Sequence, residues 1–239
     1  MTRPLRVAIP IGGFNRSGGV KTLMLVAEAM ADRGWHVRFL APDYAATPPR
    51  PLNPAIRVVP VPAGSGPHAW RLVRFYSRLP FMAGRDADVC IANFYLTAHA
   101  AFLARLFHRR LRVVYFLQGD EAVSHGRLAD APAVSRWIRF VLARVSYRLP
   151  LPMLCVSDWL RRQVQRPDAV VVGQGIDLNV FHERSRGPDA TRVAIGTIGT
   201  ASRAKGYPDV LAAVSRLAGK SFDLIVRRWT MGSRCSEAR

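Results

Sequence analysis

A glycine-rich loop near the N-terminus has the residue types of an anion-binding site. It runs from Gly12 to Gly19, between an apolar stretch that predicts a strand and a helical pattern that begins at Val20. Backbone N–H groups at a helix N-terminus, together with the helix dipole, favour a bound phosphate. The spacing excludes a Walker-type loop, because Val20 separates Gly19 from Lys21. We therefore expect Gly18 and Gly19 to bind an anion, and a purely structural turn is the alternative.

A second polar cluster, Gln118-Gly-Asp-Glu121, directly follows the apolar run Arg112 to Leu117. Ligands of open α/β sheets bind beyond the carboxyl ends of the strands, so this is a suitable place for a site. Asp120 or Glu121 could orient or deprotonate an acceptor hydroxyl, and His125 is an alternative base. Helix capping or simple solvation is the competing interpretation of the two acids.

These residues need a framework, and strand-like runs alternate with helical patterns along most of the chain. This alternation is typical of a parallel sheet covered by helices, an α/β fold with a Rossmann-like N-terminal domain. A helix is predicted from Val20 to Arg33, with Gly34 at its C-terminal end. The predicted strands of this domain are Leu5–Ile11, His36–Ala41, Ile56–Val61, Asp88–Ala92, Arg112–Leu117, Met153–Val156 and Ala169–Val172.

The pattern predicts a second, incomplete Rossmann-like domain. The first domain covers residues 1–181, and a polar linker with Gly-Pro covers 182–191. The strand Val193–Ile198, the helix Pro208–Leu217 and the strand Phe222–Val226 then begin a new domain over residues 192–226. Residues 227–239 form an aberrant tail without helical or strand periodicity, which we interpret as the product of a frameshift or premature stop.

Two segments carry a family resemblance. Val171 to Phe181 contains Gly175-Ile-Asp177, and 24 residues after Val171 the chain reads Ile195-Gly-Thr-Ile-Gly199, followed by Lys205-Gly206. Together they resemble the hinge and the start of the second domain in retaining glycosyltransferases of family 4, which have the two-domain GT-B fold. Usual members carry Asn where this chain has Gln174 and Arg where it has Thr200.

The resemblance implies transfer of a sugar from a nucleotide-sugar, with retention of configuration, to a glycan or lipid-linked acceptor. It places Gly18 and Gly19 over the donor phosphates and Lys205 on the donor diphosphate. Arg203 would replace the arginine missing at Thr200, and Gly175 and Asp177 would form the hinge. No cofactor or metal is implied, because cationic side chains and helix N-termini neutralise the diphosphate.

One part of the family pattern is missing. The pair of glutamates seven residues apart that holds the donor sugar has no counterpart, since the acids after Lys205 are Asp209, Asp223 and Glu237. We therefore expect the isolated chain to lack measurable transfer. The alternative is an inactive remnant that binds only the acceptor or a membrane.

The formal net charge of +19 has three explanations. The first is the codon usage of a GC-rich genome, which favours Arg over Lys. Lys occurs only at 21, 205 and 220, so 32 of the 35 basic residues are Arg. Contact with an anionic membrane is the second explanation, and residues 69–81 form a candidate helix with Arg71, Arg74 and Arg78 on one stripe. A packed helix with a solvated arginine face is the alternative. Nucleic-acid binding ranks last, because no nucleic-acid-binding motif is present.

Cysteine spacing and hydropathy predict a cytoplasmic protein. Peripheral contact with the inner face of the membrane is compatible with this prediction. Cys90 and Cys155 lie in strand-like apolar runs, and Cys235 is far from both, which favours free thiols over disulfides or zinc. Neither a signal peptide nor an apolar run of about 18 residues is found.

Overall fold

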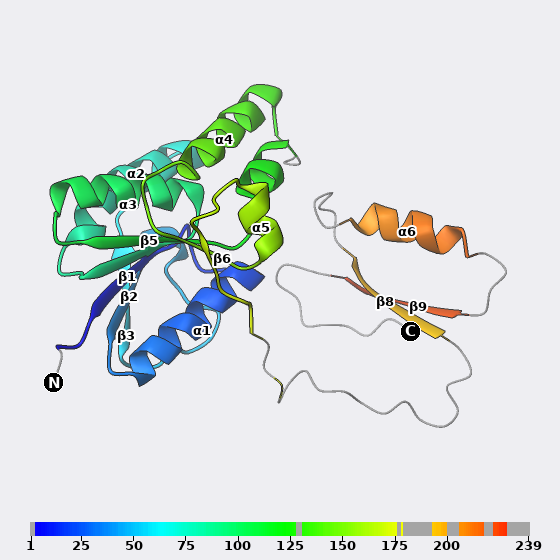
Figure 1. Cartoon of the computed structure of the whole chain (residues 1–239), viewed down its shortest axis with the longest axis horizontal. Coiled ribbons are helices and arrows are strands. Elements are labelled where there is room, and N and C mark those ends of the chain that lie inside the picture. The colour runs from blue at the N-terminus through cyan, green and yellow to red at the C-terminus, as the bar shows by residue number, and fades with distance from the viewer. Residues whose placement is uncertain are drawn as a thin grey trace. The chain divides into compact units, whose positions relative to one another are not determined.

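The computed structural model describes residues 3–127, 131–175, 178, 193–199, 206–217 and 222–228. The chain divides into two compact units, Met1–Gln174 and Gly175–Arg239. Strands and helices alternate in the first unit (Figure 1), in the order β1 (Arg6–Pro10), α1 (Gly18–Asp32), β2 (His36–Pro42), the 3-10 turn η1 (Asp43–Ala45), β3 (Ile56–Val61), α2 (His68–Gly84), β4 (Val89–Ala92), α3 (Tyr95–Phe107), β5 (Arg112–Leu117), the π-helical turn η2 (Ala122–Arg127), α4 (Ala133–Ser146), β6 (Met153–Cys155), α5 (Asp158–Gln163) and β7 (Val170–Val171).

The first unit is built on one sheet of seven parallel strands in the order β3-β2-β1-β4-β5-β6-β7. This confirms the predicted Rossmann-like parallel sheet, and each predicted strand agrees with the structure to within one residue at either end. Because all strands run the same way, their carboxyl ends lie along one edge. The glycine-rich loop after β1 and the polar cluster after β5 are therefore at the same edge of the sheet.

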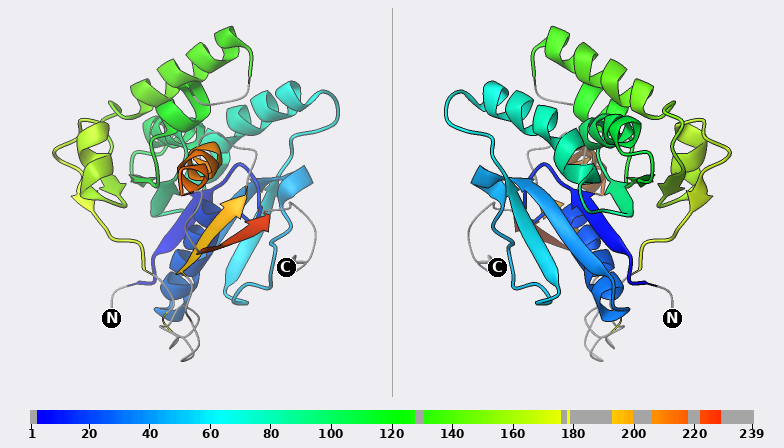
Figure 2. Two further views of the ribbon diagram at one scale, coloured as in Figure 1. Left: turned by 90° about the vertical axis from the view of Figure 1, so that its right-hand side faces the viewer. Right: turned by 90° about the vertical axis from the view of Figure 1, so that its left-hand side faces the viewer.

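Hydrophobic side chains fill both faces of the sheet. On one face, α2, α3 and α4 cover a core in which Val113, Tyr115 and Leu117 of β5 are buried (Figure 2). Phe116, the residue between the last two, belongs instead to the core under α1. The alternation follows from the two-residue period of a strand. Both faces are covered, which explains why the strands read as continuous apolar runs.

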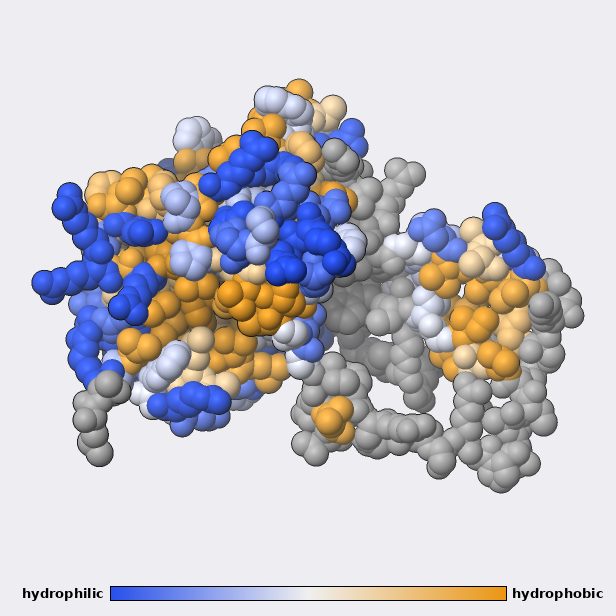
Figure 3. Space-filling view, viewed as in Figure 1, coloured by the Kyte–Doolittle hydropathy of each residue, from blue (hydrophilic) through white to orange (hydrophobic). Residues whose placement is uncertain are grey.

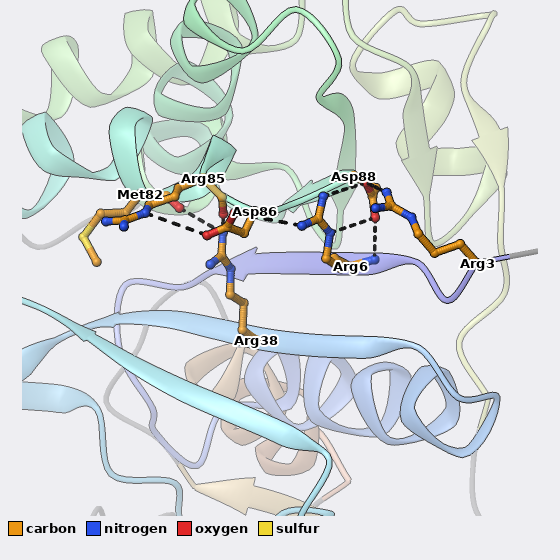
Figure 4. A network of polar contacts seen from close by, with 7 residues as sticks. All are labelled: Arg3, Arg6, Arg38, Met82, Arg85, Asp86 and Asp88. Carbon is orange, nitrogen blue, oxygen red and sulfur yellow. Dashed lines mark hydrogen bonds and ion pairs between the residues drawn. The ribbon is translucent and has the colours of Figure 1, made fainter.

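A charged cluster lies at the opposite edge of the sheet, where the strands begin (Figure 4). The Asp88 carboxylate, just before β4, accepts hydrogen bonds from the Arg6 backbone N–H at 2.9 Å and from the guanidinium groups of Arg6 and Arg3. These partners hold the pKa of Asp88 below its usual value, the side-chain hydrogen bond from Arg6 being the largest cause. Asp88 thus fixes the beginning of β1 to that of β4.

Helix α2 carries the predicted arginine stripe, and its arginines also interact with other parts of the unit. Arg71 lies over the Tyr44 ring, 3.7 Å from its centroid, and Arg74 donates to the Ser65 carbonyl. Arg78 donates to the Pro62 carbonyl. Arg74 and Arg78 remain exposed. Helical periodicity predicts the stripe, but it does not contain these interactions with η1 and with the loop before the helix.

Arginine side chains also close other loops by donating to backbone carbonyls. Arg38, half-buried on β2, donates to the carbonyls of Met82 and Arg85. Arg105 donates to Pro150. Arg166 donates to three carbonyls of the α4–β6 connection, those of Tyr147, Leu149 and Leu151. The segments after α2 and α4 are thus fixed by guanidinium groups from other parts of the chain.

The second unit contains β8 (Val193–Gly199), α6 (Tyr207–Ser215) and β9 (Phe222–Arg228), with β8 and β9 paired in parallel. These elements follow the predicted strand–helix–strand order. Among its described residues none is buried. The predicted tail 227–239 is wrong in its first two residues, because Arg227 and Arg228 continue β9 and pair with Ile198 and Gly199. The predicted linker 182–191, the rest of the tail and Cys235 lie outside the described residues, whereas Cys90 and Cys155 are buried free thiols as expected. Across the described segments, every helix is too short or too polar to cross a bilayer.

Candidate functional site

The loop after β1 is shaped around its glycines. Gly13 has φ +134°, and a Cβ on this residue would lie 2.7 Å from the Cβ of Ala45, so only glycine fits. The next residue, Phe14, donates its N–H to the Ala45 carbonyl. Ser17 then caps α1 by accepting a hydrogen bond from the Val20 N–H. The loop is therefore held in place before the helix begins.

The first turn of α1 offers backbone N–H groups beside free space. Gly18 and Gly19 begin the helix, and N–H groups of a first turn have no carbonyl partner within it. No atom lies within 4 Å of where a Cβ on Gly18 would be. A Cβ on Gly19 would lie 3.4 Å from Oε1 of Gln118. Gly18 thus faces open space, and Gly19 faces the end of β5.

Gln118 connects the two predicted segments of the site. Its Nε2 donates to the Gly19 carbonyl oxygen at 3.4 Å, across 99 residues of sequence. Its Oε1 is buried and has no hydrogen-bond partner among the described residues. A buried carbonyl oxygen without a donor is unfavourable, so this atom favours a ligand or solvent molecule that can donate a hydrogen bond.

Asp120 lies half-buried at the start of η2. Its Oδ1 accepts hydrogen bonds from the Val123 N–H and the Tyr147 hydroxyl, both at 3.2 Å. Asp120 thus caps the turn, as the structural interpretation predicted. It also lines a cavity of about 140 Å³ with Ala122, Val123, Phe140, Arg144 and Gln163. Asp120 therefore caps the turn and also lines a cavity.

Glu121 is almost fully buried, with 7% of its surface exposed. Its Oε2 accepts hydrogen bonds from the Tyr95 N–H at 2.7 Å and the Tyr115 hydroxyl at 2.9 Å. Burial raises the pKa of Glu121 to about 8, against the opposing effect of these two donors. The side chain thus joins β5 to the start of α3.

Asn93 is a further residue of this edge that the sequence pattern did not single out. It follows β4 and donates from Nδ2 to the Pro10 carbonyl at 2.6 Å, and so joins the ends of β4 and β1. A polar residue at the end of a strand was the available signal for Asn93. Nearby, burial lowers the pKa of His125, and the charge of Arg139 on α4 lowers it further.

The other predicted site residues belong to the second unit, Gly175–Arg239. Gly175 begins the second unit, and Asp177, Arg203 and Lys205 lie outside the described residues. Within the parts of the chain that are described, no group of three or more His, Cys, Asp or Glu side chains could hold a metal ion.

Comparison with known families gives this geometry a context. Residues 17–172 match the family model of the glycosyl transferase 4-like domain. The match begins at the N-cap of α1 and ends just after β7, and so includes Gly18, Gly19 and the cluster Gln118–Glu121 but not the loop residues before Ser17. The chain belongs to this family.

Solved structures show the same fold at low sequence identity. The glycosyl transferase 4-like chain is similar to the Anabaena protein HepE, solved with UDP and glucose, with a TM-score of 0.63 and 14% identity over 95% of this chain and 62% of HepE. A glycosyltransferase from Rickettsia africae gives a TM-score of 0.58 and 12% identity, over 94% of this chain and 60% of that protein. The glycotransferase of kitacinnamycin gives a TM-score of 0.53 and 15% identity, over 100% of this chain and 68% of that protein.

The chain thus spans about three fifths of the length of the first two structures. At such identities the likeness concerns the GT-B fold alone. No curated protein matches this sequence.

Proposed function

We propose that this protein takes part in glycosyl transfer from a nucleotide-sugar to a hydroxyl of a glycan or lipid-linked acceptor, with retention of configuration. The contact between Gln118 and Gly19 carries the proposal, because it brings the end of β5 to the N-terminus of α1. Membership of the glycosyl transferase 4-like family supports the same reaction class.

The geometry suggests distinct roles for the residues of the first unit. Amide N–H groups of Gly18 and Gly19 stabilise phosphate charge at the end of α1. The unpartnered Oε1 of Gln118 accepts a hydrogen bond from a sugar hydroxyl. Asp120, the more accessible of the two acids, orients the acceptor hydroxyl, and Glu121 is a positioning residue that holds β5 against α3.

The second unit would supply the donor side. Lys205 and Arg203 neutralise the diphosphate, so that the leaving nucleotide needs no metal ion, and Gly175 and Asp177 form the hinge. In this assignment residues 1–181 are the acceptor-side domain, 182–191 the linker and 192–226 the beginning of the donor-side domain. The division of the chain before Gly175 supports a boundary in this region.

Titration of the purified chain with UDP and a panel of nucleotide-sugars tests the phosphate site. We expect Lys205→Ala and Gly19→Val each to weaken binding by about tenfold, because each change removes or obstructs a group that contacts phosphate. Lys220→Ala is the matched control and should leave affinity unchanged. Unaltered affinity in both site variants would show that neither residue binds the donor. In any active form of the protein, NMR of the product anomer distinguishes retention from inversion.

A further inference from the structure

Helix α4 turns its apolar side away from the protein. Spacings of four and seven residues place Val134, Ile138 and Val145 on one stripe with Trp137 beside it. Their exposed fractions are 71% for Val134, 67% for Trp137 and 46% for both Ile138 and Val145. A helix that packs on a sheet normally directs such a stripe toward the core. Here the stripe is on the outside.

The buried side of α4 shows how this orientation is fixed. Ala143 and Ser146 are its buried residues, and both lie in its last turn. Its middle contacts η2, where a Cβ on Gly126 would lie 2.7 Å from the Cβ of Phe140. This close contact and the anchored last turn hold the helix with Val134 and Ile138 exposed. Figure 1 shows α4 extending beyond the end of the sheet.

The charged residues of the helices on this face of the sheet are all basic. Helices α2, α3 and α4, which cover the same face of the sheet, contain no Asp or Glu. On α4, Arg136 and Arg139 are exposed, and the half-buried Arg144 lines the cavity beside Asp120. Figure 3 shows hydrophobic and strongly hydrophilic residues next to each other at this end of the unit. The helix therefore combines an apolar stripe with Trp and a cationic flank.

We propose that the outer face of α4, formed by Val134, Trp137, Ile138 and Val145, docks on an anionic lipid bilayer. Apolar and tryptophan side chains enter the boundary between headgroups and acyl chains, and arginines beside them attract anionic headgroups. The absence of acids from all three helices of this face favours an anionic lipid surface over a neutral one. On α2, by contrast, Arg74 and Arg78 also donate to the carbonyls of Ser65 and Pro62.

Docking through α4 would place the membrane next to the candidate site. Helix α4 contacts η2, and η2 begins at Ala122, directly after the cluster Gln118–Glu121. An acceptor carried by a lipid would then reach the site without leaving the bilayer surface. This last step rests on the proposed function, whereas the docking itself does not.

Flotation with vesicles of phosphatidylglycerol and phosphatidylcholine tests the proposal on the whole chain. We expect the chain to float with these vesicles and not with phosphatidylcholine alone, and we expect high salt to release it. Ile138→Glu and Val134→Glu should each reduce the bound fraction by at least about tenfold, because a carboxylate opposes both the apolar and the anionic contact. Both positions are exposed, so thermal unfolding should be unchanged.

Trp159→Ala is the matched control, because Trp159 lies on α5 with 60% of its surface exposed. It should float like the wild type. Equal flotation of wild type and both glutamate variants would overturn the proposal, as would a loss of flotation in Trp159→Ala equal to theirs. If the glutamate variants change only the oligomeric state, measured by sedimentation, the stripe is a contact between two copies and the proposal is wrong. Unchanged UDP affinity in these variants separates docking from the phosphate site.

Discussion

Gln118 at the end of β5 lies against Gly19 in the first turn of α1, with Nε2 3.4 Å from the Gly19 carbonyl oxygen. A Cβ at position 19 would already touch the glutamine amide, 3.4 Å from its Oε1, so a branched side chain there displaces it. Next to it, Gly18 faces open space. Adjacent glycines thus have different neighbours, which allows the anion-binding and the packing interpretations of the loop to be tested separately.

Gly18→Val isolates the anion-binding role. Because no atom lies within 4 Å of its Cβ position, we expect the thermal unfolding midpoint to stay close to that of the wild type. In a form of the protein that turns over a nucleotide-sugar, transfer should fall at least about tenfold, or about 1.4 kcal/mol of transition-state stabilisation. Gly19→Val should show the same kinetic loss together with a displaced Gln118. Full activity of Gly18→Val would identify the loop as a structural turn.

Stability should depend on pH through Glu121. The pKa of this carboxyl is about 8 in the folded protein and near 4.5 when exposed, so between these values the folded state holds a proton that the unfolded state releases. Its contribution to stability is therefore present below pH 4.5 and is lost as pH rises toward 8, by about 1.4 kcal/mol per pH unit.

Glu121→Gln removes this titration and keeps an oxygen that can accept from the Tyr95 N–H and the Tyr115 hydroxyl. Urea unfolding of both proteins from pH 5 to 8 measures the difference. We expect the variant to gain stability relative to the wild type as pH rises. Parallel curves for the two proteins would contradict the raised pKa.

Asp88 should stabilise the amino edge of the sheet. Asp88→Ala removes the hydrogen bond to the Arg6 N–H and two guanidinium contacts, and we expect a loss of about 1–2 kcal/mol in the free energy of unfolding. Asp86→Asn is the control, because its nearest guanidinium nitrogens are 3.8 and 3.9 Å away, its side chain is 69% exposed, and Asn tolerates its left-handed backbone (φ +54°). Equal losses in the two variants would show that the Asp88 cluster has no special role. Since the pKa of Asp88 is lowered, its contribution should disappear as pH falls below the usual range of a carboxyl group.

Residues 1–174 should fold without the second unit. No residue of either hydrophobic core cluster lies after Val172, so removal of the second unit deletes none of the core residues. We expect the shortened protein to keep the thermal unfolding midpoint of the whole chain to within about 2 °C. Differential scanning calorimetry checks this. Aggregation or a midpoint lowered by more than about 10 °C would show that the two units are interdependent.

The sequence predicts the local elements of this protein well and its long-range contacts poorly. Strands such as Ile56–Val61 and Arg112–Leu117 agree with the structure at both ends, because apolar runs between turn residues determine them. Burial of Glu121 depends on the Tyr95 N–H, 26 residues earlier in the chain, and no local pattern contains that bond. Likewise, nothing in the periodicity of α2 predicts that Arg78 bonds the Pro62 carbonyl.

The arginine contacts with backbone carbonyls change the meaning of the +19 charge. A guanidinium group has five N–H donors in a planar fork, so Arg166 can serve three carbonyls and Arg38 two, whereas a lysine ammonium cannot match that geometry. A version of this chain with lysine in place of every arginine would have the same net charge. It would attract anions at the same range, but it would lose the hydrogen bonds that arrange its loops. In this protein some of the arginines therefore arrange loops while their charge still acts on a ligand or a surface.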